Sequence, residues 1–263
     1  MRLPEAFNPL SSEVDWCEPN YAVTPFITEF VNTVSNLPLV VFPVVQYYIY
    51  LRYASFCQPN LKFLLLTLQL VGIGSAYYHA TLSFAGQLVD ECGILWSLSW
   101  LSAGYWPKHL LPFGLKSRTK FTIIFIFITF CCTMLSITAP AFNQFALIIF
   151  GAPFVLTVMA DYFAYRTPTH IYTKCFPKFI LGFVFAFVIW TLDKSFCPLW
   201  RSLYIPYLHG VWHIISAYAC AYGIVLCVHE DLTVGGYPIE KIHMKYMPAW
   251  MGAMGVPYID FNP

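Results

Sequence analysis

Long apolar runs, separated by short polar stretches, fill most of the chain. A membrane-spanning helix needs roughly 20 mostly apolar residues, and seven runs approach that length: 31–53, 62–82, 87–106, 119–138, 141–163, 177–194 and 205–229. The fifth and sixth runs are the weakest candidates. Pro153 and Asp161 interrupt 141–163, and 177–194 is short. Proline is tolerated where neighbouring helices satisfy the backbone. The pattern predicts an all-α membrane protein, a seven-transmembrane helix bundle.

Composition supports a membrane protein over a soluble one. Of the 263 residues, 59% are hydrophobic and only 10% are charged, whereas soluble domains carry about 25% charged residues. No cleavable signal peptide is expected, because the first 21 residues contain no apolar core. We expect a luminal acidic N-terminal segment (1–30), a transmembrane domain (31–229) and a cytosolic C-terminal tail (230–263).

The basic residues are distributed unevenly between the two sides of the predicted bundle. With the N-terminus outside the cytosol, eleven basic residues fall in cytosolic segments and three on the other side, which is a strong positive-inside signal. The N-terminus is therefore predicted to be luminal and the C-terminus cytosolic. The cytosolic residues are Arg52, Lys62, Lys108, Lys116, Arg118, Lys120, Arg166, Lys174, Lys178, Lys241 and Lys245, and the others are Arg2, Lys194 and Arg201.

Four ionisable residues that are distant in sequence are predicted at one membrane depth. His79, Asp90, His209 and His213 all lie near luminal helix ends, within roughly 5–15 Å of the surface at 1.5 Å rise per residue. An ionisable group inside a membrane segment is a functional hypothesis by default. The other histidines are expected at or beyond the cytosolic boundary, in contact with water: His109, His170, His229 and His243.

The three membrane-embedded histidines have the chemistry of a metal site. His209 and His213 are four residues apart and project from the same helix face, and His79 supplies a third nitrogen from another helix. Three histidine ligands and an open water position form one type of catalytic zinc site. The helical HExxH motif is absent, because Gly210 stands where its glutamate would be.

The general base must then come from another segment. Asp90 is the candidate at the same depth, and Ser75 lies on the same helix face as His79. The alternatives are two core histidines with satisfied hydrogen bonds, a serine bonded within its own helix, and an aspartate favoured at a helix start. Glu91, about 100° around the helix from Asp90, is interpreted as structural. The shared depth favours metal-dependent chemistry.

Several long motifs of the chain resemble the alkaline ceramidase family. They are "SSEVDWCEPNY", "EFVNTVSN", "GIGSAYYHATLSFAGQLVDE", "PYLHGVWHI" and "GVPYI". The resemblance, which covers nearly the whole chain, implies a seven-helix membrane amidase that cleaves ceramide to sphingosine and a free fatty acid, with a fold shared with adiponectin-type receptors. It implies zinc held by His79, His209 and His213, and it makes Ser75 and Asp90 the catalytic residues.

The resemblance also implies calcium binding by the acidic N-terminal segment. The matching residues are Asp15, Trp16 through its backbone, Glu18, Asn20 and Glu29. Ca²⁺ takes six to eight oxygen ligands from carboxylates and carbonyls, in which this segment is rich. A solvated acidic tail or a set of helix caps is the alternative interpretation.

The cysteines fit the same topology. Only Cys17 and Cys197 fall in luminal segments, where disulfides persist, so they are the natural pair. Cys57 and Cys175 are predicted to face the cytosol. The others are predicted within helices: Cys92, Cys131, Cys132, Cys220 and Cys227.

The predicted mechanism is metal-assisted amide hydrolysis. A zinc-bound water is the nucleophile, Asp90 is the general acid and base, and Ser75 helps stabilise the oxyanion. Ceramide and membrane lipid are the predicted partners, and neither nucleic acid nor an obligatory protein partner is expected. We expect the membrane of the endoplasmic reticulum or Golgi, with the plasma membrane as an alternative. The alternative functions are a seven-helix lipid-sensing receptor of the adiponectin-receptor type and a purely structural zinc.

Overall fold

The computed structural model describes residues 3–51, 59–115, 117–140, 142–164 and 169–261. Its helices are α1 (Phe30–Val34), α2 (Leu37–Leu51), α3 (Pro59–Thr81), α4 (Phe84–Tyr105), α5 (Arg118–Thr138), α6 (Phe142–Ala164), α7 (His170–Ser195), α8 (Cys197–Ser202) and α9 (Leu208–Val234). Short 3₁₀ helices occupy Leu3–Phe7, Lys108–Leu110, Pro112–Gly114, Ile239–Lys241 and Ala249–Met254. Five residues used in the sequence predictions lie outside the described ranges: Arg2, Arg52, Cys57, Lys116 and Arg166.

Within the described ranges, six candidate spans are long and apolar enough to cross a membrane. They are α1 and α2 together, α3, α5, α6, α7 and α9. Many apolar side chains on these helices are exposed, among them Ile123 and Phe127 on α5 and Leu181 and Phe185 on α7, as expected where lipid covers the surface. The chain is therefore an all-α multi-pass membrane protein in its main body.

Helix α4 fills the position of the third predicted segment but is not among these six spans. Its sequence explains the difference, because Gln87, Asp90 and Glu91 interrupt its first half and serines recur in its second half. It packs against α3, α5 and α6, so neighbouring helices cover much of its surface. A seventh span at α4 stays a prediction.

The seven predicted segments coincide with helices in the described residues, and two of the differences in their boundaries have a clear local cause. The first segment is broken into α1 and α2, because Pro38 has no backbone N–H to continue the helix. The sixth segment was predicted from 177, whereas α7 begins at His170 and carries Pro177 in its interior. Its N-terminus is capped by the Thr169 side chain, which accepts a hydrogen bond from the Tyr172 N–H.

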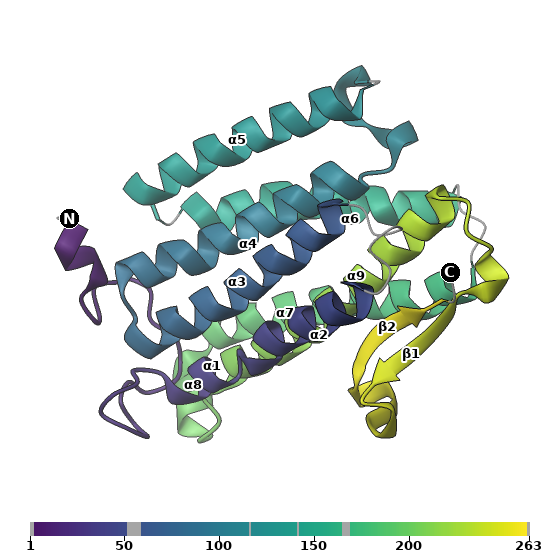
Figure 1. The fold of residues 1–263 in the computed structure, drawn as a ribbon. Coiled ribbons are helices and arrows are strands. Elements are labelled where there is room, and N and C mark those ends of the chain that lie inside the picture. Colours follow the sequence, from purple (N-terminus) through teal and green to yellow (C-terminus); the bar gives the residue numbers. More distant parts are fainter. Residues whose placement is uncertain (1–2, 52–58, 116, 141, 165–168, 262–263) are drawn as a thin grey trace.

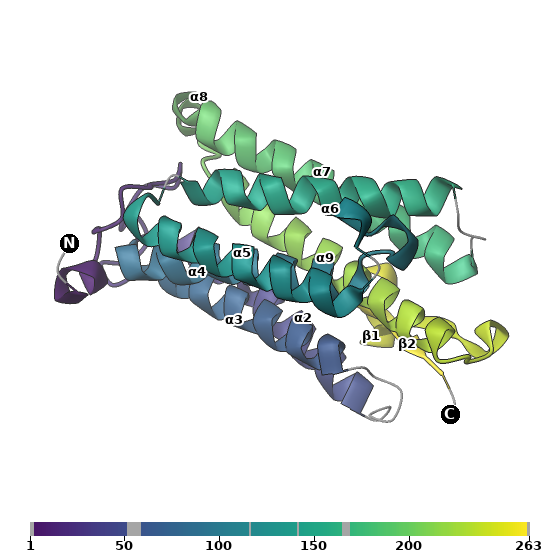
Figure 2. The same ribbon diagram turned by 90° about the horizontal axis from the view of Figure 1, so that it is seen from above.

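Helix α9 is the centre of the bundle. It packs against α7, α2 and α3, while α4 joins α3 to the outer helices α5 and α6 (Figures 1 and 2). Most of its second half is buried, from Ala217 through His229. Because α9 contacts three other long helices, its polar residues at the two ends meet different neighbouring side chains.

The C-terminal region contains a small sheet. Strands β1 (His243–Met247) and β2 (Val256–Asp260) form an antiparallel hairpin, in which Lys245 faces Tyr258. β2 packs on α9 and α2, and its Ile259 is fully buried. The hairpin lies at the end of the bundle opposite the N-terminus (Figure 1). The all-α prediction thus missed one small sheet, whose strands are only five residues long each.

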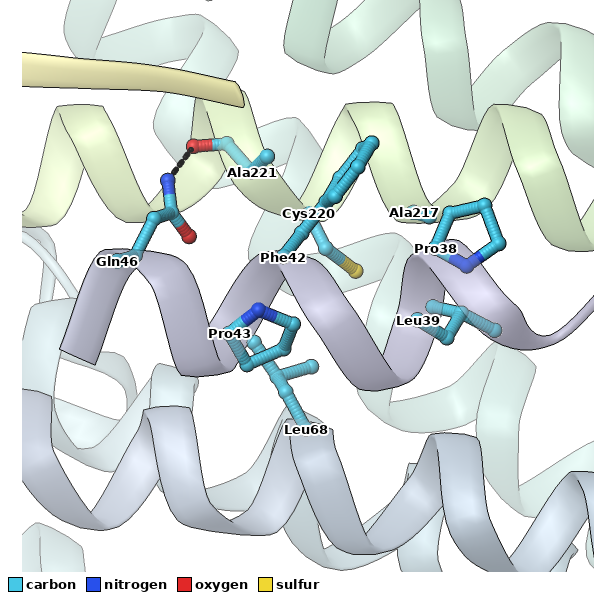
Figure 3. A pocket seen from close by; sticks show the side chains of 9 residues that line it. All are labelled: Pro38, Leu39, Phe42, Pro43, Gln46, Leu68, Ala217, Cys220 and Ala221. Carbon is cyan, nitrogen blue, oxygen red and sulfur yellow. Dashed lines mark hydrogen bonds between the residues drawn. The ribbon is translucent and has the colours of Figure 1, made fainter. Parts of the chain in front are cut away.

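One glutamine ties the hairpin to the helices. Gln46 on α2 donates from Nε2 to the carbonyl oxygens of Ala221 on α9 and Pro257 on β2, at 3.0 and 2.9 Å. The gap beside it, between α2 and α9 and closed by Leu68 of α3 (Figure 3), has a volume of about 10 Å³. A cavity needs at least about 10–15 Å³ to hold a single water. This contact region is therefore close-packed and does not accommodate a ligand.

Candidate metal centre

Three helix ends meet at one end of the bundle. His79 lies in the last turn of α3, Asp90 lies in the second turn of α4, and His209 and His213 lie in the first two turns of α9. We call this the site end. The sequence predicted that these residues share a depth, and the structure brings the histidines together: their ligand nitrogens all lie within 4.8 Å of one another, and all three rings are buried.

The turn between α3 and α4 sets the position of two site residues. Ser83 is the N-cap of α4, and its side chain accepts a hydrogen bond from the Gly86 N–H at 3.1 Å. A Cβ at Gly86 would lie 2.9 Å from Cα of Tyr78, so only glycine allows the first turn of α4 to approach α3 this closely. The close approach brings Asp90 to the level of Ser75, one turn before His79.

The three imidazoles direct their Nε2 atoms toward a common centre. Nε2 of His79 and Nε2 of His209 are 3.2 Å apart, and Nε2 of His213 lies 3.4 Å from Oγ of Ser75. Two ligands at about 2.0–2.1 Å from a tetrahedral zinc lie about 3.3–3.4 Å apart. The observed separation is close to that value, so the histidines fit a zinc ion.

The opposite nitrogens of two of these rings have hydrogen-bond partners. Nδ1 of His79 lies 2.5 Å from Oε2 of Glu29, and Nδ1 of His213 lies 2.8 Å from Oγ of Ser35. A histidine ligand usually donates its second N–H to such an acceptor, which fixes the ring tautomer. Both contacts therefore orient a lone pair on Nε2 toward the centre.

His209 is held in a different way. Its ring stacks on Trp16, with centroids 3.7 Å apart and planes inclined by 23°. Its Nδ1 is buried and has no hydrogen-bond partner among the described residues, while its backbone N–H donates to Oδ1 of Asp193 at 3.3 Å. Trp16 thus covers one face of the histidine cluster with an apolar ring.

Ser75 and Asp90 border the same centre. The Ser75 side chain hydrogen-bonds to Asp90 and also approaches His213, so it links the carboxyl group to the histidine cluster. Asp90 is buried, and its Oδ1 has no hydrogen-bond partner among the described residues. A buried carboxyl oxygen without a partner is chemically able to accept a proton from a group at the centre.

The acidic N-terminal residues lie next to the histidines. Glu18 and Glu29 are buried, and burial raises the pKa of both, that of Glu29 to about 8. The charges of Asp15 on Glu29 and of Glu29 on Glu18 add to the shifts. Buried carboxylates close to one another require compensation by cations or hydrogen bonds. This donor set fits a hard cation such as Ca²⁺.

Some of these oxygens already have partners. The Glu18 carboxylate accepts from the backbone N–H groups of Val31 and Asn32, each at 2.7 Å, so it caps α1 as the alternative interpretation expected. Oδ1 of Asp15 accepts from the N–H of Trp16 at 3.0 Å. Within the described residues, the histidines form a tight group of potential ligands, whereas the acidic side chains are not grouped in this way. Asn20 is exposed.

A disulfide fastens the N-terminal segment over the site end. Cys17 and Cys197, the two cysteines predicted to pair, are joined, with Cα atoms 5.2 Å apart. Arg201 on α8 adds a hydrogen bond from Nε to the Cys17 carbonyl at 2.9 Å. The segment that carries Trp16 and Glu18 is therefore anchored to the connection between α7 and α9.

Two further predictions concern polar residues at the other end of the bundle. His229 was expected in contact with water, and that expectation is wrong: its side chain is only 2% exposed, and Nε2 lies 3.0 Å from Oγ1 of Thr169. The reason is that α9 continues to Val234 and packs against α7 there. His109 is largely exposed and lies 3.1 Å from the buried Asp161.

Sequence reasoning missed the partners of the histidines. The sequence indicates no role for Ser35 beyond its place in a motif. It predicts only a backbone contact to calcium for Trp16 and only a calcium contact for Glu29. The available signal was the polar sequence "NTVSN" at the start of an apolar segment, which is unusual for lipid-facing helix. Such a run predicts polar contacts inside the bundle, but it does not identify the partners.

Comparison with known proteins identifies the relatives of this chain. A family model described as Ceramidase matches residues 8–260. An alkaline ceramidase of Drosophila melanogaster is 32% identical over 98% of this chain and 91% of its own length. Human alkaline ceramidase 1 is 29% identical over 99% of this chain and 98% of its own length. An alkaline ceramidase of Saccharomyces cerevisiae is 28% identical over 86% of this chain and 79% of its own length.

Proposed function

The chain belongs to the alkaline ceramidase family of membrane hydrolases, and from this premise we propose that it hydrolyses the amide bond of ceramide to sphingosine and a free fatty acid. The observation that carries the proposal is the convergence of three buried histidine Nε2 atoms next to Ser75 and Asp90. Neither a simple packing role nor a ligand-sensing role requires a buried carboxyl group with an unpartnered oxygen beside three imidazoles.

His79, His209 and His213 are the proposed zinc ligands. A zinc ion there would supply Lewis acidity, which lowers the pKa of water and polarises a carbonyl group. The protein holds the rings in place through Glu29 at His79 and Ser35 at His213. The stacked ring of Trp16 excludes bulk water from one side of His209, which strengthens electrostatic interactions within the site.

Asp90 is the proposed general base and acid. Hydrolysis adds water across the C–N bond, so one water proton must leave the attacking oxygen and one must reach the amine. Asp90 accepts the first proton on its unpartnered Oδ1 and returns it to the sphingosine nitrogen as the C–N bond breaks. Positioned acid–base groups of this kind typically contribute about 10²–10⁴-fold.

Ser75 is the proposed hydrogen-bond donor to the oxyanion. Its hydroxyl lies between Asp90 and Nε2 of His213, which is close enough to the centre to meet a carbonyl oxygen there. The charge on that oxygen grows as the nucleophile adds, so a fixed donor stabilises the transition state more than the ground state. Ser75 therefore acts as a second stabiliser beside the metal.

The membrane setting suits a lipid substrate. The site lies at the ends of apolar helices rather than on a water-exposed domain, so the acyl chain and the sphingoid chain of ceramide remain in an apolar environment while water reaches the site end. We propose that the site end faces the lumen of the endoplasmic reticulum or Golgi, or the exterior at the plasma membrane. The uneven distribution of basic residues supports this orientation.

Calcium is the second proposed cofactor. Asp15, Glu18, Glu29, Asn20 and the backbone of Trp16 would hold it, and it would neutralise the carboxylates that are close to one another. The support is the burial of Glu18 and Glu29 next to each other, with the charge of Asp15 raising the pKa of Glu29 and the charge of Glu29 raising that of Glu18. A bound cation in this segment would also stabilise the segment that carries Trp16. Whether this role is regulatory or structural is decided by comparing activity and folding with and without calcium.

The direct test is ceramide hydrolysis by the purified protein in detergent or nanodiscs. We expect release of sphingosine that is lost on zinc chelation and returns when zinc, but not magnesium, is restored. Glu91→Gln is the matched control, because it changes the carboxylate adjacent to Asp90 without altering the proposed base. Full activity in protein that metal analysis shows to be free of zinc would refute the proposal.

A further inference from the structure

Both residues that flank α1 contact a histidine of the metal centre. Glu29 precedes the helix and reaches Nδ1 of His79, and Ser35 follows it and reaches Nδ1 of His213 at 2.8 Å. The two contacts are made on the nitrogens that point away from the centre. The short helix thus spans the outer side of two of the three rings.

The direction of the Ser35 hydrogen bond follows from its second contact. The Ser35 hydroxyl has one hydrogen, which it donates to the carbonyl oxygen of Asn32 at 3.0 Å. Toward His213, Oγ of Ser35 is therefore the acceptor and Nδ1 is the donor. A neutral imidazole with its hydrogen on Nδ1 carries its lone pair on Nε2, which faces the centre.

We propose that Ser35 is a positioning residue that holds His213 in the tautomer and orientation that bind metal. The inference rests on the proposed zinc site, and it adds a residue to which the resemblance and the comparisons assign no role. Ser35 does not touch the reacting atoms. It acts through His213, in the way that outer hydrogen-bond partners support metal ligands in other proteins.

Gly210 explains how the hydroxyl comes so close. A Cβ at position 210 would lie 3.2 Å from Oγ of Ser35 and 3.3 Å from Cγ1 of Val31. Any larger residue on this face of α9 would push α1 away and lengthen the contact between Ser35 and His213. The glycine between the two histidines of α9 is thus the counterpart of Ser35, and it excludes a glutamate of the HExxH type from this position.

The structure also holds α1 in place. A helix of this length is unstable alone, because few of its hydrogen bonds repay nucleation. Glu18 accepts from the first N–H groups of α1, and Nδ2 of Asn32 donates to Oε2 of Glu29 at 3.1 Å. Asn32 thereby connects the partner of His79 to the partner of His213, so α1 acts as a rigid support for both.

The test compares zinc affinity in Ser35→Ala with that in a matched serine variant. Ser99→Ala removes a hydroxyl that is fully buried, whereas Ser35 is half-buried. The Ser99 hydroxyl contacts Oγ1 of Thr129 at 2.7 Å in the α4–α5 interface, away from the centre. The zinc dissociation constant is measured by competition with a chelator in detergent. We expect it to rise about 10–100-fold in Ser35→Ala and to stay at the parent value in Ser99→Ala.

The absorption spectrum of the cobalt-substituted protein reports on the arrangement of the metal ligands. It would not change if Ser35 contributed only to folding stability. The visible bands should change in position in Ser35→Ala, because the His213 ring is no longer fixed, and should match the parent in Ser99→Ala. Ser35→Cys is the second variant: it changes only the terminal atom of the side chain from oxygen to the larger sulfur, so it leaves no cavity, and sulfur is a weak acceptor. It should also weaken zinc binding.

Three outcomes are distinguishable. Weaker zinc binding and a changed cobalt spectrum in both Ser35 variants, with a normal Ser99→Ala, support the role of Ser35. Parent-like affinity and spectrum in either folded Ser35 variant overturn it and leave the zinc site intact. A parent protein that binds no zinc at all overturns the proposed function, and the inference about Ser35 with it.

Discussion

His213 and His229 are two buried histidines on the same helix, four turns and two residues apart, with different surroundings. At the site end, His213 meets two other imidazoles, Ser35 and Ser75. At the opposite end, His229 meets the Thr169 hydroxyl and the edge of the Tyr172 ring. Burial is equally deep at both positions, so burial does not distinguish a ligand from a packed histidine.

The difference lies in what the ring nitrogens meet. Around His213, Nδ1 has an acceptor and Nε2 meets other lone pairs, an arrangement that favours a cation at the centre. At His229, Nε2 meets a hydroxyl, which can either donate or accept and so satisfies this nitrogen without a metal. Convergent lone pairs, with an acceptor behind the rings of His79 and His213, are therefore a better sign of a metal site than burial or HxxxH spacing.

The largest expected difference between the site end and the opposite end of the bundle is their exposure to opposite sides of the membrane. A glycosylation acceptor engineered near Glu13, beside the site end, should be fully modified in cells, and one placed after Lys245 should remain unmodified. The reason is the excess of basic residues in the segments predicted to be cytosolic. Mobility on gels before and after glycosidase treatment measures the result. The reverse pattern would invert the assigned depth of every site residue.

The next largest effect is the difference in zinc content and activity between His213→Ala at the site end and His229→Ala at the opposite end. His213→Ala should lose stoichiometric zinc and reduce ceramide hydrolysis to the assay background, because two ligands and an open position hold the metal poorly. His229→Ala is the matched control on the same helix and should keep zinc and turnover, with a lower thermal stability from the lost packing. Metal analysis and activity on the same preparations provide the check. A His213→Ala protein with full zinc would exclude this residue from the site.

The sequence predicts the two ends with unequal success. The apolar runs predict the long helices, and the helix ends place His79, Asp90, His209 and His213 together, because helical rise converts sequence position to depth. Tertiary contacts that join distant segments are not encoded in such periodicity. The contact of Ser35 with His213 depends on the close approach allowed by Gly210, and no local pattern announces that approach.

At the opposite end the prediction failed for a related reason. His229 was assigned to water because an ideal span would end near residue 229, whereas α9 continues to Val234. The hairpin that covers α2 and α9 was missed, because β1 and β2 are only five residues long each and because the apolar residues of β2 do not alternate with polar ones. Their stability derives from packing on the helices and from Gln46, which are long-range contacts.

Replacing the proposed base tests whether the site end performs acid–base chemistry in addition to binding metal. Asp90→Asn keeps the shape of the side chain but cannot accept a proton, so turnover should fall by about 10²–10⁴-fold while zinc content stays at the parent level. Ser75→Ala should also keep zinc, with a loss below the about 10²–10³-fold typical of an oxyanion donor, since the metal shares that role. Steady-state turnover and metal analysis distinguish the cases.

Two outcomes would revise these assignments. If Asp90→Asn loses zinc as completely as His79→Ala, then Asp90 is a ligand or a support for the ligands. If it keeps both zinc and activity, the base lies elsewhere, and Glu91 is the next candidate to replace. The Glu91→Gln control in the same series separates these possibilities.

The disulfide should have a smaller effect, which is confined to the site end. A native bridge typically contributes about 2–5 kcal/mol in small secreted domains, and less is expected in a bundle that lipid holds together. Cys17→Ser should therefore lower the thermal midpoint and weaken activity in proportion to the loosened Trp16 contact with His209. Mass spectrometry of the unreduced parent should find the peptide that joins Cys17 and Cys197. Free thiols at both positions in freshly isolated protein would contradict the bridge.

The smallest effect is expected at the partner of His229. Thr169→Val keeps the shape of the side chain but removes the hydroxyl that contacts Nε2 and caps α7. A neutral hydrogen bond contributes about 0.5–1.5 kcal/mol, and a buried nitrogen left without a partner costs about 1–3 kcal/mol. The free energy of unfolding should fall by an amount in that range, with a lower thermal midpoint, whereas zinc affinity and turnover should match the parent. The comparison with Ser35→Ala is direct, because each variant removes one hydroxyl from a buried histidine of α9. If Thr169→Val weakened zinc binding as much as Ser35→Ala does, the two ends of the helix would be energetically coupled, and the partner of a histidine would no longer distinguish a ligand from a packed ring.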